Sequence, residues 1–334
     1  MTIGGALRGA AGRLRAAGVE TARLDAEVLL ADILGLERWR LVADGVEAPP
    51  AAALETFEAR VRRREAREPL AYILGRKEFW SLEFAVTPDV LIPRPETECL
   101  VETAIRWLSA RTNSVLSPQS SSLVVVDVGT GPGTILLSLA GEMEGPRYVG
   151  TDVSAAALAL ARRNAEAFGL APRVEWIEGD LFEALGAVGL EGRVDLLISN
   201  PPYVSEPDMD RLAPEIRRHE PALALCGGPD GLDVIRRVVA ETPRWLAPGG
   251  ALLFEFGDGQ ANACLGLLRE SGAFGTGRIV RDLGGYSRAV IATLQGSVSR
   301  VPGSGFNGRG PSMADPESRT RNPEPDAGAE GRRG

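Results

Sequence analysis

The 334-residue sequence contains one histidine, His219, and three widely separated cysteines, Cys99, Cys226 and Cys264. A single histidine excludes a metal centre built from several histidines, and we expect no metal site. An odd number of distant cysteines indicates free thiols in a reducing compartment, not a disulfide framework. We therefore expect a cytoplasmic protein.

No stretch of the chain is apolar over enough residues to span a membrane, so we expect no membrane contact. Arginines spaced among alanine and leucine near the N-terminus are typical of an amphipathic helix, not of a signal peptide. The net charge of −8 argues against direct nucleic-acid binding, which requires clustered cations. We expect a monomer with enough residues for two domains.

The first 75 residues have the periodicity of helices. A second apolar stripe follows Thr21, which we expect to cap its helix, and ends at Gly35. A third helix is predicted from Pro50 to Glu68. These patterns predict a small helical bundle over residues 1–75.

Residues 76–94 have the period of two that is typical of β-strands. The pattern predicts two short strands that turn near Thr87-Pro88-Asp89. We expect this segment to be a β-hairpin linker between two domains. A helix is predicted from Pro95, because proline suits the first turn of a helix.

Residues 95–295 alternate between short apolar runs and helical segments, which predicts an α/β domain of the Rossmann-like, doubly wound type with a mostly parallel sheet. A serine-rich segment at residues 109–122 predicts a surface loop. Residues 296–334 contain almost no apolar side chains, so we expect a disordered tail. The predicted strands are residues 123–128, 147–151, 173–177, 194–199, 251–256, 276–280 and 288–293.

A glycine-rich turn follows the first of these strands. Residues 124–133 read VVVDVGTGPG, and their three glycines allow positive φ angles and a close approach of the backbone to a ligand. Position 134 is threonine, so the G-x-G-x-x-G signature of dinucleotide binding is absent, and no P-loop motif is present.

Two carboxylates stand at the tips of the next two strands. Asp152 ends the second strand, where a carboxylate can accept hydrogen bonds from both ribose hydroxyls of an adenosine ligand. Asp180 follows the third strand and suits an adenine amino group. Together with the glycine turn, these residues predict an adenosine pocket without phosphates.

The tetrapeptide Asn200-Pro201-Pro202-Tyr203 follows the fourth predicted strand. Open α/β sheets bind ligands at the carboxyl ends of such strands. Two prolines stiffen the backbone and remove N–H donors, which leaves carbonyl groups free to accept hydrogen bonds. With the ring of Tyr203, these groups suit a planar group that carries an NH2, such as an amide or an exocyclic amine.

These motifs resemble those of the HemK/PrmC protein-glutamine methyltransferases, over roughly residues 20–294. The resemblance also rests on PLAYILG at 69–75, PRPETE at 93–98, EPALAL at 220–225 and GGPDGL at 227–232. It implies a class I methyltransferase domain that uses S-adenosyl-L-methionine, and an N-terminal helical domain that docks a protein substrate. The implied reaction methylates the side-chain amide of the glutamine in the Gly-Gly-Gln loop of peptide-chain release factors, which are the expected partners.

The resemblance and the patterns together give a set of expected site residues. The residues expected to bind the cofactor are Asp127, Gly129, Thr130, Gly131, Pro132, Gly133, Asp152, Asp180, Leu181 and Asn200. Those expected to bind the substrate are Asn200, Pro201, Pro202 and Tyr203, of which Asn200, Pro201 and Tyr203 are the expected catalytic residues.

An amide nitrogen is a poor nucleophile because its lone pair is delocalised into the carbonyl, whereas a sulfonium methyl donor is already activated. We expect the Asn200 side-chain oxygen to accept one amide N–H, the Pro201 carbonyl to accept the other, and Tyr203 to pack on the amide plane. No general base is required before transfer. We therefore assign Glu255 and Asp258 to surface or capping roles.

Three other functions stay open at this point. Amino-methyltransferases that act on adenine in DNA or on a base in RNA share Asn-Pro-Pro-Tyr, although they need a basic groove and flip the base out. A sister branch of the family methylates a glutamine of a ribosomal protein. A non-catalytic scaffold could also keep the fold and the cofactor pocket.

Overall fold

The structure, a computed structural model, describes residues 2–43, 48–112 and 123–295. The expected tail at residues 296–334, and residues 113–122 of the expected loop, lie outside the described residues. All three cysteines are unpaired, as expected. Within the described ranges, none of the helices is long and apolar enough to cross a membrane.

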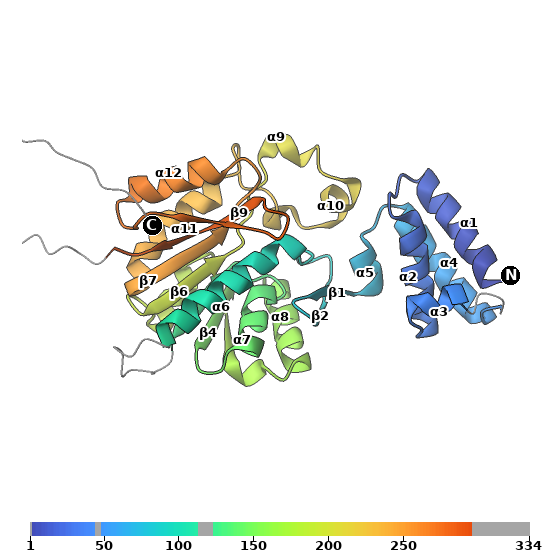
Figure 1. The fold of residues 1–334 in the computed structure, drawn as a ribbon, viewed down its shortest axis with the longest axis horizontal. Helices are drawn as coiled ribbons and strands as arrows, with labels where there is room; N and C mark the ends of the chain where they lie inside the picture. Colours follow the sequence, from blue (N-terminus) through green and yellow to red (C-terminus); the bar gives the residue numbers. More distant parts are fainter. Residues whose placement is uncertain (1, 44–47, 113–122, 296–334) are drawn as a thin grey trace, which may run out of the picture. The chain divides into compact units, whose positions relative to one another are not determined.

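The N-terminal helices pack around a core of their own (Figure 1). Gly35 ends the second helix with a φ of 62°, as the sequence predicts. Thr21 precedes that helix, but its side chain makes no capping hydrogen bond, so this expectation is wrong. Pro69 separates the last two helices. The helices are α1 (Ile3–Ala16), α2 (Ala22–Leu34), α3 (Arg38–Ala43), α4 (Ala51–Glu65) and α5 (Leu70–Leu74).

A two-stranded antiparallel hairpin follows, made of β1 (Arg76–Phe79) and β2 (Leu82–Ala85). The hairpin turns at Trp80 and Ser81, with φ angles of 50° and 59°. Turns of this kind usually carry asparagine or glycine, which neither residue is. The Trp80 backbone N–H donates to Glu98, 3.0 Å away, and helps to fix the turn. A turn also forms at residues 87–90, where the Val90 N–H donates to the Thr87 carbonyl at 3.2 Å, but it follows β2, so the expectation that it joins the two strands is wrong.

The main sheet has seven strands in the order β5-β4-β3-β6-β7-β9-β8. The strands β3 to β7 are parallel, and β9 pairs antiparallel with both β7 and β8. This order confirms the Rossmann-like class I methyltransferase fold. The strands are β3 (Val124–Val128), β4 (Arg147–Asp152), β5 (Val174–Glu178), β6 (Val194–Ser199), β7 (Leu246–Glu255), β8 (Arg278–Arg281) and β9 (Ser287–Thr293).

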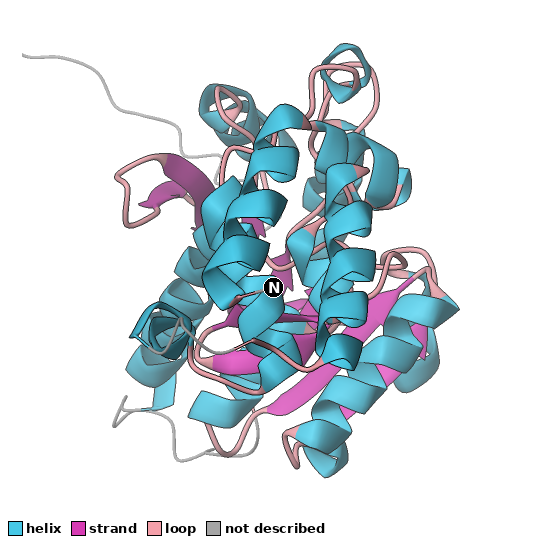
Figure 2. Ribbon diagram, turned by 90° about the vertical axis from the view of Figure 1, so that its right-hand side faces the viewer, coloured by secondary structure: helices cyan, strands magenta, loops and turns pink. Residues whose placement is uncertain are grey.

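Helices cover both faces of this sheet (Figure 1, Figure 2). Alternate residues of each strand point to opposite faces, so Val125 packs with α6 and α7, whereas Val126 packs with α11 and α12. The longer helices are α6 (Glu98–Thr112), α7 (Thr134–Glu142), α8 (Ala155–Ala167), α11 (Asp233–Trp245) and α12 (Ala261–Ser271). The short ones are α9 (Glu206–Met209), α10 (Pro214–His219), η1 (Pro95–Thr97), η2 (Ala171–Arg173), η3 (Glu183–Val188) and η4 (Ala222–Ala224).

Residues 109–112 continue α6, so the expected loop begins later than predicted. The Arg111 side chain donates to the Gly249 carbonyl, 3.0 Å away, and also lies against the Asp195 carboxylate. These partners are far from the helix in sequence, which explains why the serine-rich composition alone set the boundary too early.

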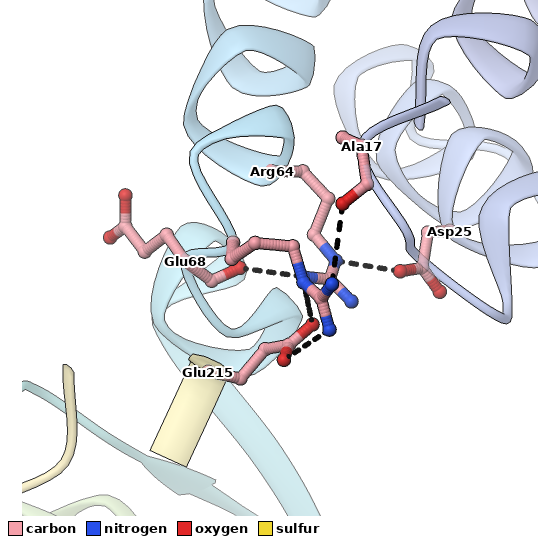
Figure 3. A network of polar contacts seen from close by, with 6 residues as sticks. Ala17, Asp25, Arg64, Glu68 and Glu215 are labelled. Atoms are coloured by element: carbon pink, nitrogen blue, oxygen red, sulfur yellow. Dashed lines mark hydrogen bonds and ion pairs between the residues drawn. The ribbon is translucent and has the colours of Figure 1, made fainter. Parts of the chain in front are cut away.

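A charged network joins the N-terminal helices to α10 (Figure 3). The buried Arg64 donates to Asp25 at 2.7 Å and to Glu215 at 2.9 Å. Arg67 donates two hydrogen bonds of 2.7 Å to the two oxygens of Glu215, and a third to the Ala17 carbonyl. Burial acts to raise the pKa of Glu215, but the hydrogen bonds from Arg67 and Arg64 outweigh it and lower the pKa to about 2.

Candidate active site

A cavity of about 450 Å³ lies at the carboxyl ends of β3, β4 and β6. The strand order reverses between β3 and β6, which is where doubly wound sheets bind their ligands. Many of the expected site residues line this cavity: Gly129, Thr130, Gly131, Pro132, Asp152, Asp180, Leu181, Asn200, Pro201 and Pro202. Asp127, Gly133 and Tyr203 lie outside its lining.

The glycine loop, residues 129–133, is held open toward the cavity. Gly129 and Gly131 have φ angles of 76° and 57°, and a Cβ atom added at either would meet nothing within 4 Å. The backbone N–H groups of Gly129 and Thr130 donate to the Thr151 carbonyl, and the Gly131 N–H donates to Asp152, 2.8 Å away. The loop is therefore tied to the tip of β4, with space for a ligand against its backbone.

Asp127 lies beneath this loop and is 1% exposed. Its Oδ2 accepts a 2.7 Å hydrogen bond from the Thr130 hydroxyl, whereas its buried Oδ1 has no hydrogen-bond partner in the described part of the chain. Burial raises the pKa of Asp127 to about 7, and the neighbouring charge of Asp152 acts in the same direction. A buried carboxylate oxygen without a donor is unfavourable, and an ammonium group would satisfy it. This feature fits the amino-acid end of S-adenosyl-L-methionine.

The tips of β4 and β5 contribute Asp152, Asp180 and Leu181 to the cavity lining. Asp152 accepts hydrogen bonds from backbone N–H groups, and burial raises its pKa above the ordinary value. Asp180 forms a 2.8 Å ion pair with Arg237 of α11, and the Arg237 side chain also lines the cavity. Leu181 has a φ of 50°, and its carbonyl accepts a hydrogen bond from the Thr151 hydroxyl. Arg237 is 57 positions from Asp180, so no local pattern could have revealed it.

A chain of three hydrogen bonds holds the side chain of Asn200. Its Nδ2 donates to the Thr97 hydroxyl at 3.2 Å, and that hydroxyl donates to Glu255 Oε2 at 2.8 Å. The Tyr203 hydroxyl donates to Glu255 Oε1 at 3.1 Å. Within the described residues, the Asn200 Oδ1 atom and the Pro201 carbonyl have no hydrogen-bond partner.

Glu255 is the last residue of β7 and is 1% exposed, so the surface or capping role expected for it is wrong. Burial raises its pKa to about 7, although the hydroxyls of Thr97 and Tyr203 act to lower it. Sequence reasoning also gave no role to Thr97. Thr97 lies within the PRPETE block at residues 93–98, and this block is the sequence signal that could have identified Thr97.

The Asn-Pro-Pro-Tyr loop, residues 200–203, rests against the GGPDGL block. The Val204 N–H donates to the Leu225 carbonyl, and the Gly227 N–H donates to the Val204 carbonyl, both at 2.8 Å. Gln260 donates to the Tyr203 carbonyl at 3.0 Å. A Cβ atom at Gly227 would lie 2.6 Å from the Pro202 carbonyl oxygen, so only glycine allows this contact.

Arg94 and Glu220 link two further blocks of the sequence. Arg94 donates to Glu220 Oε1 at 2.6 Å, and the Ile92 N–H donates to Glu220 Oε2 at 3.2 Å. Glu220 is buried, and Arg94 lines the cavity. The ion pair therefore fixes the wall of the cavity that residues 89–97 provide.

Comparisons with known proteins agree with this geometry. The family model "PrmC N-terminal domain" matches residues 5–75, and the model "Methyltransferase domain" matches residues 125–220. The release factor glutamine methyltransferase of Geobacter sulfurreducens is 44% identical to this chain over 261 residues. The aligned region covers 78% of this chain and 86% of that protein.

Two other relatives bear the same name. The protein of Cereibacter sphaeroides is 41% identical over 88% of this chain and 99% of its own length. The protein of Moorella thermoacetica is 41% identical over 87% of this chain and 98% of its own length. The chain belongs to the release factor glutamine methyltransferase family.

Proposed function

We propose that this protein transfers a methyl group from S-adenosyl-L-methionine to the side-chain amide nitrogen of the glutamine in the Gly-Gly-Gln loop of a peptide-chain release factor. The proposal rests on the hydrogen-bond acceptors of the Asn-Pro-Pro-Tyr loop. Its Asn200 oxygen and Pro201 carbonyl are two acceptors that have no hydrogen-bond partner among the described residues, and both residues line the cavity. The NH2 of a carboxamide has two N–H donors and matches them.

The residues around the glycine loop would hold the cofactor. Asp127 would bind the ammonium group through Oδ1, and the loop would bring its backbone close to the ligand. Asp152 would accept hydrogen bonds from the ribose hydroxyls. Asp180 would bind the adenine amino group, with Leu181 beside the ring. When bound, the cofactor would supply an activated methyl group. Its sulfur would keep both electrons of the broken carbon–sulfur bond, and the proton lost by the methylated amide nitrogen would pass to solvent water.

The Asn-Pro-Pro-Tyr loop would orient the substrate amide. Asn200 Oδ1 accepts one N–H, the Pro201 carbonyl accepts the other, and the nitrogen lone pair is directed toward the methyl donor. Orientation of this kind contributes up to about 7–11 kcal/mol to lowering a barrier in favourable cases. Pro202 keeps the loop rigid. Tyr203 contributes through its hydrogen bond to Glu255, because its ring is not part of the cavity lining.

The remaining segments have supporting roles in this proposal. Residues 1–75 dock the protein substrate, and residues 76–94 link them to the methyltransferase domain at residues 95–295. The net charge of −8 supports a protein substrate over a nucleic acid. We expect the chain to act as a monomer, which sedimentation can test.

Mass spectrometry of a purified release factor, incubated with this protein and S-adenosyl-L-methionine, tests the proposed function. We expect one added methyl group on the Gly-Gly-Gln glutamine. A release factor in which that glutamine is replaced by alanine is the matched control and should stay unmodified. Methylation of ribosomal protein or nucleic acid, with none on the release factor, would contradict the proposal.

A further inference from the structure

The side-chain amide of asparagine has two ends of nearly equal shape and opposite hydrogen-bonding character. If the Asn200 amide turned by 180°, an NH2 group would replace the acceptor oxygen. It would then face the NH2 of the substrate, and two donors cannot form a hydrogen bond. The orientation of this amide therefore decides whether Asn200 can bind a carboxamide nitrogen.

Thr97 sets that orientation through its single hydroxyl proton. A hydroxyl donates one hydrogen bond, and an ionised carboxylate only accepts. Because Thr97 donates to Glu255 Oε2 at 2.8 Å, its oxygen can only accept from Asn200. Nδ2 of Asn200 lies 3.2 Å from that oxygen, so Oδ1 is the end of the amide that stays available.

Glu255 is fixed in its own place by burial and by two hydroxyl donors. It is 1% exposed, and its second oxygen accepts the Tyr203 hydroxyl proton. No ion pair to Glu255 occurs among the described residues, since the nearby Arg288 pairs with Asp282. A buried carboxylate without a cation is costly, which makes a purely structural role for Glu255 unfavourable.

We propose that Glu255, acting through Thr97, keeps the Asn200 oxygen directed at the substrate amide, so that both are positioning residues of the methyl transfer. This inference rests on the proposed function, because it requires a carboxamide nitrogen as the group that Asn200 binds. It assigns a shared role to residues of η1, β7 and the loop after β6.

The test uses the full chain with Thr97→Val, which keeps the side-chain volume and removes the hydroxyl. We expect kcat on the release factor to fall about 10- to 100-fold, as for a misplaced catalytic group. The dissociation constant of S-adenosyl-L-methionine, measured by calorimetry, should change less than about twofold, which also shows that the variant is folded. Thr97→Ser restores the hydroxyl and should return kcat to within about threefold of the wild type.

A second readout is the pH dependence of kcat at saturating cofactor. When Glu255 is protonated it can donate to Thr97, which frees the Thr97 proton to turn toward Asn200. We therefore expect kcat of the wild type to rise with pH through about 7. The groups that face Glu255 are Glu96, Cys99, Tyr203 and Arg288, and the raised pKa values of Cys99 and Tyr203 keep both neutral in this range.

Glu255→Gln should remove this rise and lower kcat about tenfold at pH 8, because glutamine offers one acceptor oxygen to two hydroxyl donors. Asp258→Asn is the matched control, since Asp258 is an exposed acid three positions away, and it should keep the wild-type profile.

Wild-type kcat in Thr97→Val, or an equal loss in Thr97→Ser, would overturn the inference. The proposed function would survive if Asn200→Ala were inactive in the same assay. A wild-type protein that fails to methylate the release factor would overturn the proposed function, and the inference with it.

Discussion

The surroundings of the buried Asp127 carboxylate favour the ligand-bound protein over the ligand-free protein. This carboxylate is buried beneath the glycine loop, where one oxygen accepts a hydrogen bond from Thr130 and the other has no partner within residues 2–43, 48–112 and 123–295. Burial raises its pKa from 3.8 to about 7, so folding favours the protonated form. The stability that this group contributes is therefore complete below pH 3.8 and is lost as the pH rises through about 7.

Replacement of Asp127 by asparagine should separate binding from stability. At pH 8 we expect Asp127→Asn to weaken S-adenosyl-L-methionine binding about 10- to 100-fold, because a hydrogen bond between charged groups is lost. The cofactor-free variant should be more stable than the wild type at pH 8, by at most about 4 kcal/mol, since it carries no buried charge. Calorimetric binding and thermal unfolding at pH 5 and pH 8 measure both effects. Unchanged cofactor affinity would show that Asp127 does not bind the ammonium group.

At the scale of elements, the Asn-Pro-Pro-Tyr loop depends on the chain segment that packs behind it. Residues 225–227 pair with Val204, and Gly227 allows the Pro202 carbonyl to approach closely. The loop is therefore positioned by backbone contacts to residues 225–227, of which Cys226 also lines the cavity.

We expect Gly227→Ala to displace this loop, because the added Cβ would lie 2.6 Å from the carbonyl oxygens of Pro202 and Gly231. The kcat on the release factor should fall about 10- to 100-fold. The affinity for S-adenosyl-L-methionine should stay close to that of the wild type. Gly266→Ala is the control, because Gly266 lies in α12 with open space around it, and it should gain about 0.5–1 kcal/mol of stability. Equal kcat values for the two variants would contradict the account.

Strands and loops that carry a local signal in the sequence were predicted well. The parallel strands carry short apolar runs. The glycine loop and the Asn-Pro-Pro-Tyr loop directly follow two of these strands, so the fold class predicted that both loops lie at the same edge of the sheet. The turn at Trp80 and Ser81 was missed because neither residue is a typical turn residue. Glu255 was misassigned because its partners Thr97 and Tyr203 are 158 and 52 positions away, and an acid at a strand end has the same local pattern as a cap.

At the scale of the whole molecule, the ion pairs of Glu215 connect the N-terminal helices to α10, which precedes the buried Glu220 of the cavity wall. The pKa of Glu215 is lowered to about 2, so its stabilising contribution is present above about pH 4.5 and is lost as the pH falls toward 2.

Glu215→Gln should lower the free energy of unfolding by about 1.5–3 kcal/mol at pH 7, because it weakens charged hydrogen bonds to Arg64 and Arg67. The difference from the wild type should shrink as the pH falls toward 2. Urea unfolding at pH 7 and at lower pH values measures it. Asp208→Asn, which removes an exposed acid of α9, is the control and should leave stability unchanged. An equal effect of both variants at pH 7 would argue against a specific contribution of the network.

The central claim is that Asn200 orients the substrate amide and does little for the binding of the cofactor. Turnover and cofactor affinity of Asn200→Ala, measured on the same preparation, test it most directly. We predict a loss of release factor methylation of at least about 100-fold, with a dissociation constant for S-adenosyl-L-methionine within a few-fold of the wild type. Turnover close to that of the wild type, or a loss explained entirely by weaker cofactor binding, would contradict the account.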